Sequence, residues 1–257
     1  MSEQKEPSAA RLASTILLLR DGADGLEVFM VVRHHEIDFA SGALVFPGGS
    51  VEPGDRSIAA DGALCPPIDG VSDDLMALRV GAIRETFEEC GLLLARPQGS
   101  RDVVGRDAMR LIDVEGGRAD FAGALARHRL APAVDLLAPF AHWVTPTFMP
   151  KRFDTHFFVA AAPPDQLAAH DGHESVDSVW INPGRALEEA KAGRYTIIFP
   201  TRLNLQMLSP ARTVAEAFEQ IRARKIVTVM PEPVKLPTGR GLRIPLEAGY
   251  GGDVFEM

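Results

Sequence analysis

Cysteine, basic charge and long apolar runs are all scarce in this sequence. Its two cysteines, Cys65 and Cys90, are too few for a disulfide framework and fit the inert, buried role common for free cysteine. The net charge of −8 argues against a nucleic-acid binder, because such proteins present a basic face. No apolar run approaches the roughly 18 residues of a membrane span, and residues 1–14 lack a secretory signal core. We therefore expect a cytoplasmic protein that contacts neither membrane nor nucleic acid.

The remaining composition is that of an ordinary globular protein. Apolar residues make up 46% and charged residues 24% of the 257 positions. A chain of this size can bury one substantial core, so we expect a single domain over residues 1–257. A homodimer stays an open option, because composition does not determine the oligomeric state.

Strand-like and helix-like segments alternate along the chain. Residues 13–19 and 26–32 are short and β-rich, and the glycine-containing segment 21–25 between them predicts a hairpin. Residues 43–46 predict a third strand, which Pro47-Gly48-Gly49 ends in a sharp loop. Further on we expect a helical insertion at about 98–138, strands at 153–161 and 176–181, helices at 183–192 and 213–224, an edge strand at 225–230 and an irregular tail from about 231. This pattern predicts an α/β or α+β fold.

A helix from about Asp73 to Leu94 carries the clearest chemical signal. Its apolar residues follow a helical period, and Gly91 is placed to end it. Glu85, Glu88 and Glu89 stand at i, i+3 and i+4, which puts three carboxylates on one face. Such a stripe is common on solvated helices, but carboxylate oxygens are also the ligands that Mg²⁺ prefers.

Several other chemistries lack their sequence signals. There is no Walker loop, no strand followed by GxGxxG and no Gly-x-Ser-x-Gly elbow, so kinase, dehydrogenase and common serine-hydrolase functions are disfavoured. The seven histidines form no HxxxH or HExxH pair, and the sequence therefore predicts no zinc site.

The segment upstream of the helix changes the interpretation of the glutamates. Gly48-Gly49 lie in a glycine loop that closes on the acid Asp55, and residues 84–92 read Arg-Glu-Thr-Phe-Glu-Glu-Cys-Gly-Leu. Together these segments resemble the Nudix box, a glycine loop with a following acid and a helix reading Arg-Glu-apolar-x-Glu-Glu-x-Gly-apolar. Thr86 replaces an aliphatic residue, Asp55 replaces a glutamate, and about 28 residues separate Asp55 from Arg84 where the family normally has seven.

The split box is similar to that of one Nudix branch, the peroxisomal-type coenzyme A and acyl-coenzyme A diphosphatases and their bacterial relatives. The segments around 42–49, 143–146 and 151–158 also resemble this branch, so the likeness extends over roughly residues 12–210. We expect the insertion at about 56–72 to form a surface loop. All helix carboxylates and both glycines remain, which favours retained activity.

The resemblance implies an α/β/α sandwich with a mixed central sheet and a metal-dependent diphosphatase using Mg²⁺ or Mn²⁺. It assigns the metal to Glu85, Glu88, Glu89 and the backbone carbonyl of Gly48, and it gives Arg84 the role of an ion-pair partner that orients a glutamate. The general base is either a helix carboxylate or Glu174, an acid just before the strand at 176–181.

Three residues are candidates for binding the small nucleotide diphosphate substrate. Lys151 and Arg152 precede a strand and could bind a phosphate, and Phe46 adjoins the glycine loop. Three functions remain open on this basis. The first is a diphosphatase that converts coenzyme A or acyl-coenzyme A to a phosphopantetheine and 3′,5′-ADP, the second is a diphosphatase for nucleotide sugars, ADP-ribose or dinucleotides, and the third is a Nudix-fold binding protein without catalysis.

Overall fold

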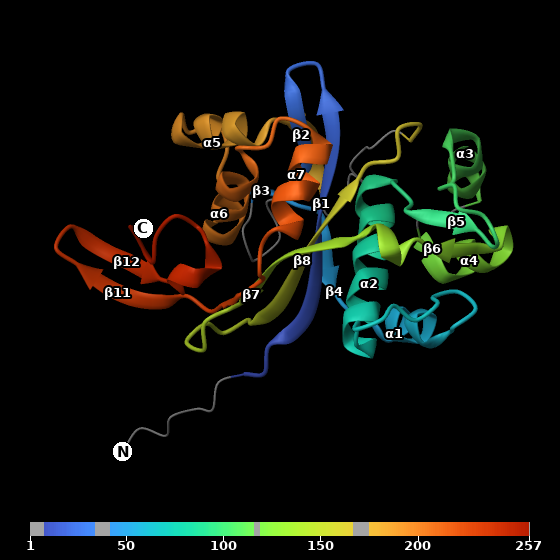
Figure 1. Cartoon of the computed structure of the whole chain (residues 1–257), viewed down its shortest axis with the longest axis horizontal. Coiled ribbons are helices and arrows are strands. Elements are labelled where there is room, and N and C mark those ends of the chain that lie inside the picture. The colour runs from blue at the N-terminus through green and yellow to red at the C-terminus, as the bar shows by residue number, and fades with distance from the viewer. Residues whose placement is uncertain (1–7, 34–41, 116–118, 167–174, 257) are drawn as a thin grey trace.

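The fold is built around a mixed β-sheet that runs through the middle of the molecule (Figure 1). The computed structural model describes residues 8–33, 42–115, 119–166 and 175–256. The main path of the sheet has the order β10-β7-β8-β1-β2-β3, with β4 paired to β1 and β9 paired to β2. Its strands are β1 (Arg11–Gly22), β2 (Gly25–Arg33), β3 (Leu44–Val45), β4 (Gly48–Ser50), β7 (Ala138–Val144), β8 (Phe153–Ala161), β9 (Ser175–Ile181) and β10 (Thr228–Val229).

Strand β1 positions the rest of the sheet. Along one edge it pairs in parallel with β8, from Arg11 to Leu19. Along its other edge it pairs with β2 near Leu19 to Gly22 and with the short strand β4 near Ala13 to Thr15. Two different strands therefore pair with this edge of β1: β4, which contains Gly48 and Gly49, lies beside the first half of β1, and β2 lies beside the second half.

Helices cover both faces of the sheet, as the sandwich prediction requires (Figure 1). Alternate residues of β1 serve the two faces, with Ile16 and Leu18 in one core cluster and Leu17 and Leu19 in the other. Because all four side chains are buried, this strand is continuously apolar. One face packs against α1 (Pro53–Ala60), α2 (Asp73–Cys90), α3 (Arg106–Val114) and α4 (Phe121–His128), and the other against α5 (Pro183–Lys191), α6 (Phe199–Leu208) and α7 (Val214–Arg222).

The two segments expected as insertions lie on the α2 side of the sheet (Figure 1). The described residues between 95 and 136 include a two-stranded sheet of β5 (Ala95–Pro97) and β6 (Leu130–Pro132), the helices α3 and α4, and the short 3₁₀ helix η2 (Val134–Leu136). The segment 56–72 is not entirely a loop, because α1 continues to Ala60 and the side chain of Cys65 is buried in the core.

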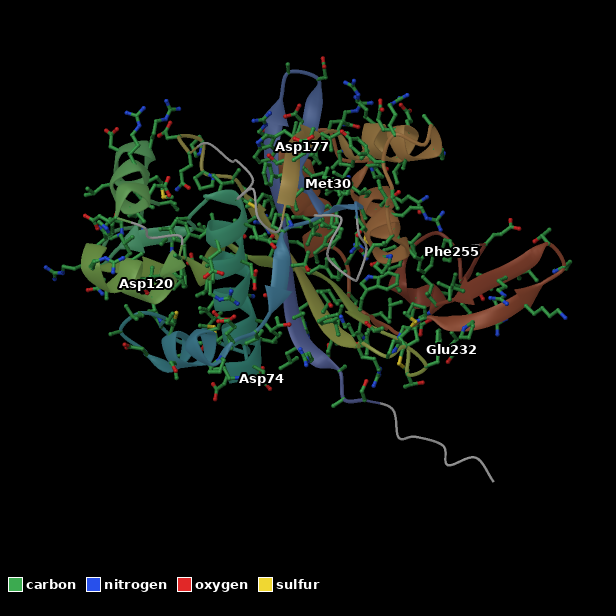
Figure 2. The ribbon with its side chains drawn as sticks, turned by 180° about the vertical axis from the view of Figure 1, so that it is seen from behind. Met30, Asp74, Asp120, Asp177, Glu232 and Phe255 are labelled. Carbon is green, nitrogen blue, oxygen red and sulfur yellow. The ribbon has the colours of Figure 1, made fainter. Side chains whose placement is uncertain are left out.

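The tail is regular, and the prediction of an irregular segment from about residue 231 is therefore wrong. Strands β11 (Glu232–Leu236), β12 (Gly239–Arg243) and β13 (Val254–Glu256) form an antiparallel sheet, with the 3₁₀ helix η3 (Leu246–Ala248) before its last strand. Figure 2 shows Glu232 and Phe255 on this part of the molecule, on the opposite side of the central sheet from Asp74. The sequence pattern does not predict these short strands, because this segment is rich in proline and glycine, and both residues are depleted in strands and common in turns.

Helix α6 and strand β7 were also absent from the sequence prediction. Strand β7 begins at Ala138, where the helical insertion was expected to end. Among the described residues, no helix combines the length and the apolar character needed to cross a membrane.

Candidate active site

Helix α2 presents its glutamates to the glycine strand β4. Ser72 caps the start of the helix, where its hydroxyl accepts a hydrogen bond from the Leu75 amide, and Gly91 ends it in the left-handed conformation with a φ of 66°. The amide of Gly48 donates a hydrogen bond to Glu89 Oε2 at 3.2 Å. The predicted approach of the helix carboxylates to the glycine turn is thus present in the structure.

Arg84 is the centre of a charged network beneath this approach. Its Nε and Nη2 atoms donate to the two oxygens of Asp55 at 2.9 and 3.0 Å, which is a bidentate pair. The Nη1 atom lies 2.8 Å from Glu88 Oε2 and 3.0 Å from Glu85 Oε1. Nη2 also donates to the carbonyl of Ser50 at 3.0 Å, which connects the helix to the end of β4. Arg84 therefore holds the glycine loop and two of the three glutamates in place.

Helix α1 closes the gap in the split motif. Glu52 caps α1 in a reciprocal capping box with Asp55, and the Glu52 amide donates to Asp55 Oδ2 at 2.8 Å. Asp55 is only 1% exposed, and its oxygens are satisfied by this amide and by Arg84. Although 28 residues separate Asp55 and Arg84 in sequence, α1 and α2 pack together and restore the contact.

Burial and charge shift the protonation of this network. Burial acts to lower the pKa of Arg84, but the hydrogen bonds to Asp55 and the charges of Glu85, Asp55 and Glu88 outweigh it, so the pKa is raised above its ordinary value. Burial raises the pKa of Glu88 above 4.5 despite the attraction of Arg84, and the charges of Glu52 and Asp55 add to this rise. One guanidinium is shared by three carboxylates, and it does not fully offset the desolvation of Glu88.

Two glycines permit the close approach of the strand and the helix. A Cβ on Gly48, which has a φ of 155°, would lie 2.7 Å from Thr15 Cα. A Cβ on Gly49 would lie 2.6 Å from Glu85 Cδ. Larger residues at either position would push β4 away from β1 or displace a glutamate.

The donor set fits a hard divalent cation. In the described part of the chain, the carboxylates of Asp55, Glu85 and Glu88 contact the guanidinium of Arg84, and Glu89 lies beside them against the Gly48 amide, so acidic groups outnumber the one arginine. Carboxylate oxygens and backbone carbonyls are the ligands of Mg²⁺ and Mn²⁺. The three helix glutamates do not form a tight ligand group, because Glu85 and Glu88 converge on Arg84 while Glu89 contacts Gly48.

Comparison with known proteins gives this arrangement a family. The model of the NUDT19 Nudix domain matches residues 66–208, which is more than half of the chain. The chain belongs to the Nudix hydrolase family. A crystal structure of a Nudix hydrolase from Alicyclobacillus acidocaldarius is 31% identical and superposes with a TM-score of 0.68, over 82% of this chain and 96% of that one.

Curated Nudix relatives are more distant. The acyl-coenzyme A diphosphatase NUDT19 of Xenopus laevis is 26% identical over 78% of this chain, and the putative nudix hydrolase 7 of Caenorhabditis elegans is 24% identical over 90%. This chain spans 64% of the length of the Xenopus protein and 70% of the Caenorhabditis protein. The Nudix domain match begins after Asp55, so the contact between Asp55 and Arg84 is seen in the structure and not in that match.

The remaining residues that the sequence analysis assigned to the base or to substrate binding are not among those gathered at Arg84. Glu174 lies outside the described residues. Phe46 is 5% exposed and packs in the core on the sheet face opposite α2, which does not suit a substrate contact. Lys151 is exposed just before β8, and Arg152 donates to the carbonyls of Thr145 and Ser8 at 3.1 and 2.6 Å.

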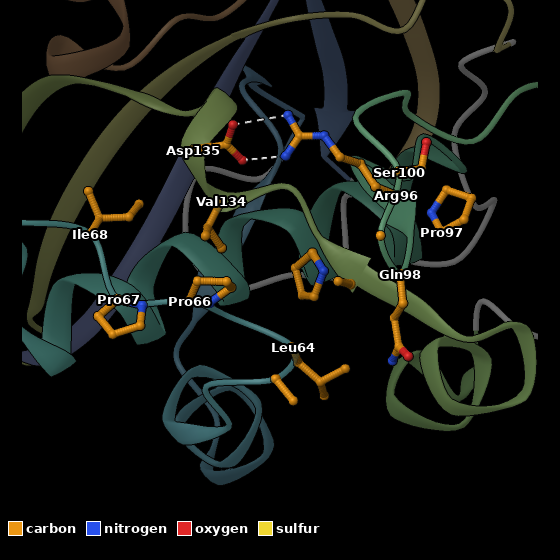
Figure 3. Close-up of a pocket in the computed structure, with 14 residues that line it drawn as sticks. Leu64, Pro66, Pro67, Ile68, Arg96, Pro97, Gln98, Ser100, Val134 and Asp135 are labelled. Atoms are coloured by element: carbon orange, nitrogen blue, oxygen red, sulfur yellow. Dashed lines mark hydrogen bonds and ion pairs between the residues drawn. The ribbon is translucent and has the colours of Figure 1, made fainter.

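A cavity of about 330 Å³ lies between the two inserted segments of the Nudix fold (Figure 3). Leu64, Pro66 and Ile68 line one side, and Arg96 and Asp135 line the other. The Arg96 guanidinium and the Asp135 carboxylate form a double hydrogen bond at 2.5 and 3.0 Å, so the two charges offset each other. None of the three α2 glutamates lines this cavity, and we assign no chemistry to it.

Proposed function

We propose that this Nudix protein is a Mg²⁺- or Mn²⁺-dependent diphosphatase that hydrolyses coenzyme A or acyl-coenzyme A to a phosphopantetheine and 3′,5′-ADP. The observation that carries the proposal is the convergence of the α2 glutamates, the glycine strand and Arg84. Support for the substrate class comes from relatives named acyl-coenzyme A diphosphatase in frog, chicken and human, at 26 to 28% identity.

Each residue of the site has a distinct task in this proposal. Glu85, Glu88, Glu89 and the Gly48 carbonyl would hold the divalent cation. When bound, such a cation neutralises the diphosphate oxygens and the charge that develops on the leaving phosphate. Arg84 is a positioning residue, because it orients Glu85 and Glu88 and anchors them to Asp55 and Ser50.

Hydrolysis requires a base that takes a proton from water as the water oxygen bonds to phosphorus and the anhydride P–O bond breaks. Glu88 is one candidate, in which case Glu85, Glu89 and the Gly48 carbonyl would hold the cation without it; its pKa is raised by burial and its side chain is 33% exposed, which leaves it open to water. Glu174 is the alternative. The pH profile of kcat in Glu88→Gln and Glu174→Gln distinguishes them, because only loss of the base removes the acidic limb.

The positive charges before β8 are the proposed contacts for substrate phosphates. Lys151 is exposed, and Arg152 is fixed by backbone carbonyls. The carbonyls that accept from Arg152 carry no net charge, so the guanidinium keeps the positive charge that would attract an anion. Both residues precede Phe153, which pairs with Arg11 at the same end of β1 as the glycine strand.

The decisive experiment is a competition assay with Mg²⁺ and a panel of coenzyme A, acyl-coenzyme A, ADP-ribose, NADH, a nucleotide sugar and nucleoside triphosphates. Mass spectrometry of the products in ¹⁸O-labelled water identifies the cleaved bond and the attacked phosphorus. We expect coenzyme A or its thioesters to have the highest kcat/KM.

Two results of the same assay would contradict the proposed function. If ADP-ribose were turned over a hundredfold more efficiently, a difference of about 2.7 kcal/mol in transition-state binding, the coenzyme A assignment would be withdrawn. Inactivity over the whole panel would instead favour a Nudix-fold binding protein. The Glu89→Gln protein, purified in parallel, controls for contaminating phosphatases.

A further inference from the structure

Strand pairing brings together two histidines and an aspartate that are distant in sequence. His142 on β7 lies directly opposite His156 on β8, and Asp154 is two residues before His156 on the same strand. Because side chains two residues apart point to the same face of a strand, all three lie on one side of the sheet. Their ligand atoms are all within 4.8 Å of one another, and in the described part of the chain they are the group with this spacing.

We propose that His142, Asp154 and His156 form a binding site for a divalent transition-metal ion, Zn²⁺ in the first instance, separate from the glutamates of α2. The two imidazole rings stack with their centroids 4.0 Å apart and their planes inclined by 21°. His142 Nε2 lies 2.5 Å and His156 Nε2 lies 3.8 Å from Asp154 Oδ1. Both ε-nitrogens therefore approach the same carboxylate oxygen.

These spacings match a shared metal after small movements. Zn²⁺ binds nitrogen and carboxylate oxygen at roughly 2.0–2.2 Å, so two ligands of one tetrahedral ion are about 3.3 Å apart. The distance from His142 Nε2 to Asp154 Oδ1 would have to increase by under about 1 Å, and the distance from His156 Nε2 to Asp154 Oδ1 would have to decrease by about half an ångström. Side-chain rotation alone can supply both movements. The direct contact between His142 Nε2 and Asp154 Oδ1 would be replaced by a bond from each atom to the ion.

A hydrogen bond behind His142 supports this assignment independently. Its other ring nitrogen, Nδ1, is 2.8 Å from Thr228 Oγ1 on β10, the strand that pairs with β7 at this position. When Nδ1 donates its proton to this hydroxyl, Nε2 carries the lone pair that a metal binds, and an outer hydrogen bond of this kind is a regular feature of metal-binding histidines. A cation here would join β7 and β8 directly and β10 through Thr228.

The surroundings also suit a three-ligand site with room for water. The side chains of His142, His156 and Asp154 are 19, 23 and 31% exposed, so solvent can supply the fourth ligand. Burial and the neighbouring His142 lower the pKa of His156 to about 4, and the ring is therefore neutral near pH 7. Two imidazoles favour Zn²⁺ over Mg²⁺, whereas the all-oxygen set on α2 favours the reverse.

The two ligand sets are neighbours but do not overlap. Ser14 on β1 pairs with Gly49 of the glycine strand on one side and with His156 on the other. Two strand spacings therefore separate Gly49 from His156, about 10 Å between their backbones. The histidine site shares no residue with the glutamate network, and its existence does not depend on the proposed diphosphatase activity.

The test measures metal binding and not turnover. Tag-free protein is stripped with a chelator and then titrated with Co²⁺ and Zn²⁺ in millimolar Mg²⁺, which occupies the oxygen ligands. We expect one Zn²⁺ per chain by elemental analysis, visible Co²⁺ absorption bands, and their loss when Zn²⁺ is added. Asp154→Asn and His156→Ala should each weaken Zn²⁺ binding at least a hundredfold, and Thr228→Val by about ten- to a hundredfold.

Two controls locate the ion. His128→Ala removes a histidine that contacts one carboxylate, Glu115, at 2.9 Å and has no third ligand in the described structure, so binding should not change. Glu88→Gln/Glu89→Gln should also bind normally. Unchanged Zn²⁺ affinity in Asp154→Asn and Thr228→Val, or loss of binding in the double glutamate variant, would overturn the proposal. Asp154→Asn is close to isosteric and decides the question if His156→Ala fails to fold.

Discussion

The glutamates of α2 and the cluster of His142, Asp154 and His156 on β7 and β8 lie on the same face of the central sheet, yet they differ in how the sequence encodes them. Glu85, Glu88 and Glu89 lie within five residues because a helix brings i, i+3 and i+4 together. His142 and His156 are fourteen residues apart and meet only because two strands pair in one register. Local sequence can reveal the first kind of site, whereas the second kind requires the tertiary structure.

The two clusters also differ in how their charges are held. The glutamates converge on the buried Arg84, which in turn binds a fully buried Asp55. The histidine cluster has a neutral ring beside one partly exposed carboxylate. We therefore expect the buried pair of Arg84 and Asp55 to be essential to the fold around it, and the histidine cluster to tolerate substitution.

The largest expected effect follows from removing Arg84. Arg84→Ala leaves Asp55 buried without a counter-charge, and breaking a buried pair in this way costs about 3–5 kcal/mol of unfolding free energy. Arg84→Lys keeps the charge but lacks the planar fork that binds both oxygens of Asp55, so it should restore only part of the loss. Urea denaturation measures both.

Arg96→Ala is the matched control for Arg84. Arg96 also forms a double hydrogen bond to an aspartate, but the Asp135 side chain is 56% exposed. The expected cost is under about 1 kcal/mol. If Arg84→Ala and Arg96→Ala lost the same amount of unfolding free energy, burial would not make the pair of Arg84 and Asp55 more important for stability than the exposed pair of Arg96 and Asp135.

The next effect is on turnover. Glu89→Gln retains the shape of a side chain that accepts the Gly48 amide but removes a charge facing the glycine strand. We expect kcat/KM to fall about a hundredfold or more, at least about 2.7 kcal/mol of transition-state stabilisation, with unchanged circular dichroism. Glu188→Gln, at an exposed position on α5, is the control. Normal turnover in Glu89→Gln would remove Glu89 from the site.

The sequence predicted the fold best where one element carries its own signal. Strand 153–161 and the α2 helix have the predicted bounds or nearly so, because apolar periodicity and the Gly91 stop are local. The missed β11–β13 sheet is rich in glycine and proline, and its strands depend on pairing with one another. Sequence resemblance likewise placed Arg84 beside the glutamates but could not reveal that α1 carries Asp55 back to it.

A smaller effect is expected where the glycine strand meets α2. Gly49→Ala would place a Cβ 2.6 Å from Glu85 Cδ, so Glu85 must move, and overpacking of this kind costs about 1–3 kcal/mol. Because Glu85 is a proposed metal ligand, we expect Gly49→Ala to need a higher Mg²⁺ concentration than the parent for half-maximal activity. Gly54→Ala is the matched control, because nothing lies within 4 Å of its added Cβ and alanine favours the helix. Equal behaviour of the two variants would contradict close packing at Gly49.

A change of pH should reveal the cost of keeping Glu88 ionised. Its folded-state pKa is raised above 4.5, so the folded state favours the protonated form and the penalty appears as pH rises from the unfolded to the folded pKa. Without divalent metal, Glu88→Gln should therefore melt slightly above the parent at pH 8 and equal it below about pH 4. Saturating Mg²⁺ should stabilise the parent more than the variant, because only the parent retains the ligand. If Glu88→Gln melted below the parent at pH 8 without metal, the prediction that ionised Glu88 destabilises the metal-free fold would be wrong.

The smallest effect is expected at Ser14, which stands between the two clusters. Its hydroxyl is fully buried and has no hydrogen-bond partner among the described residues, whereas the buried Thr86 hydroxyl donates to the Ala82 carbonyl at 2.7 Å. Removing an unpaired buried hydroxyl is nearly neutral, so Ser14→Ala should change the unfolding free energy by less than about 0.5 kcal/mol, while Thr86→Val should cost about 1 kcal/mol. A loss of 1 kcal/mol or more in Ser14→Ala would mean that this hydroxyl is bonded in solution. Because Ser14 pairs with both Gly49 and His156, such a bond would couple the two ligand sets that the structure otherwise keeps apart.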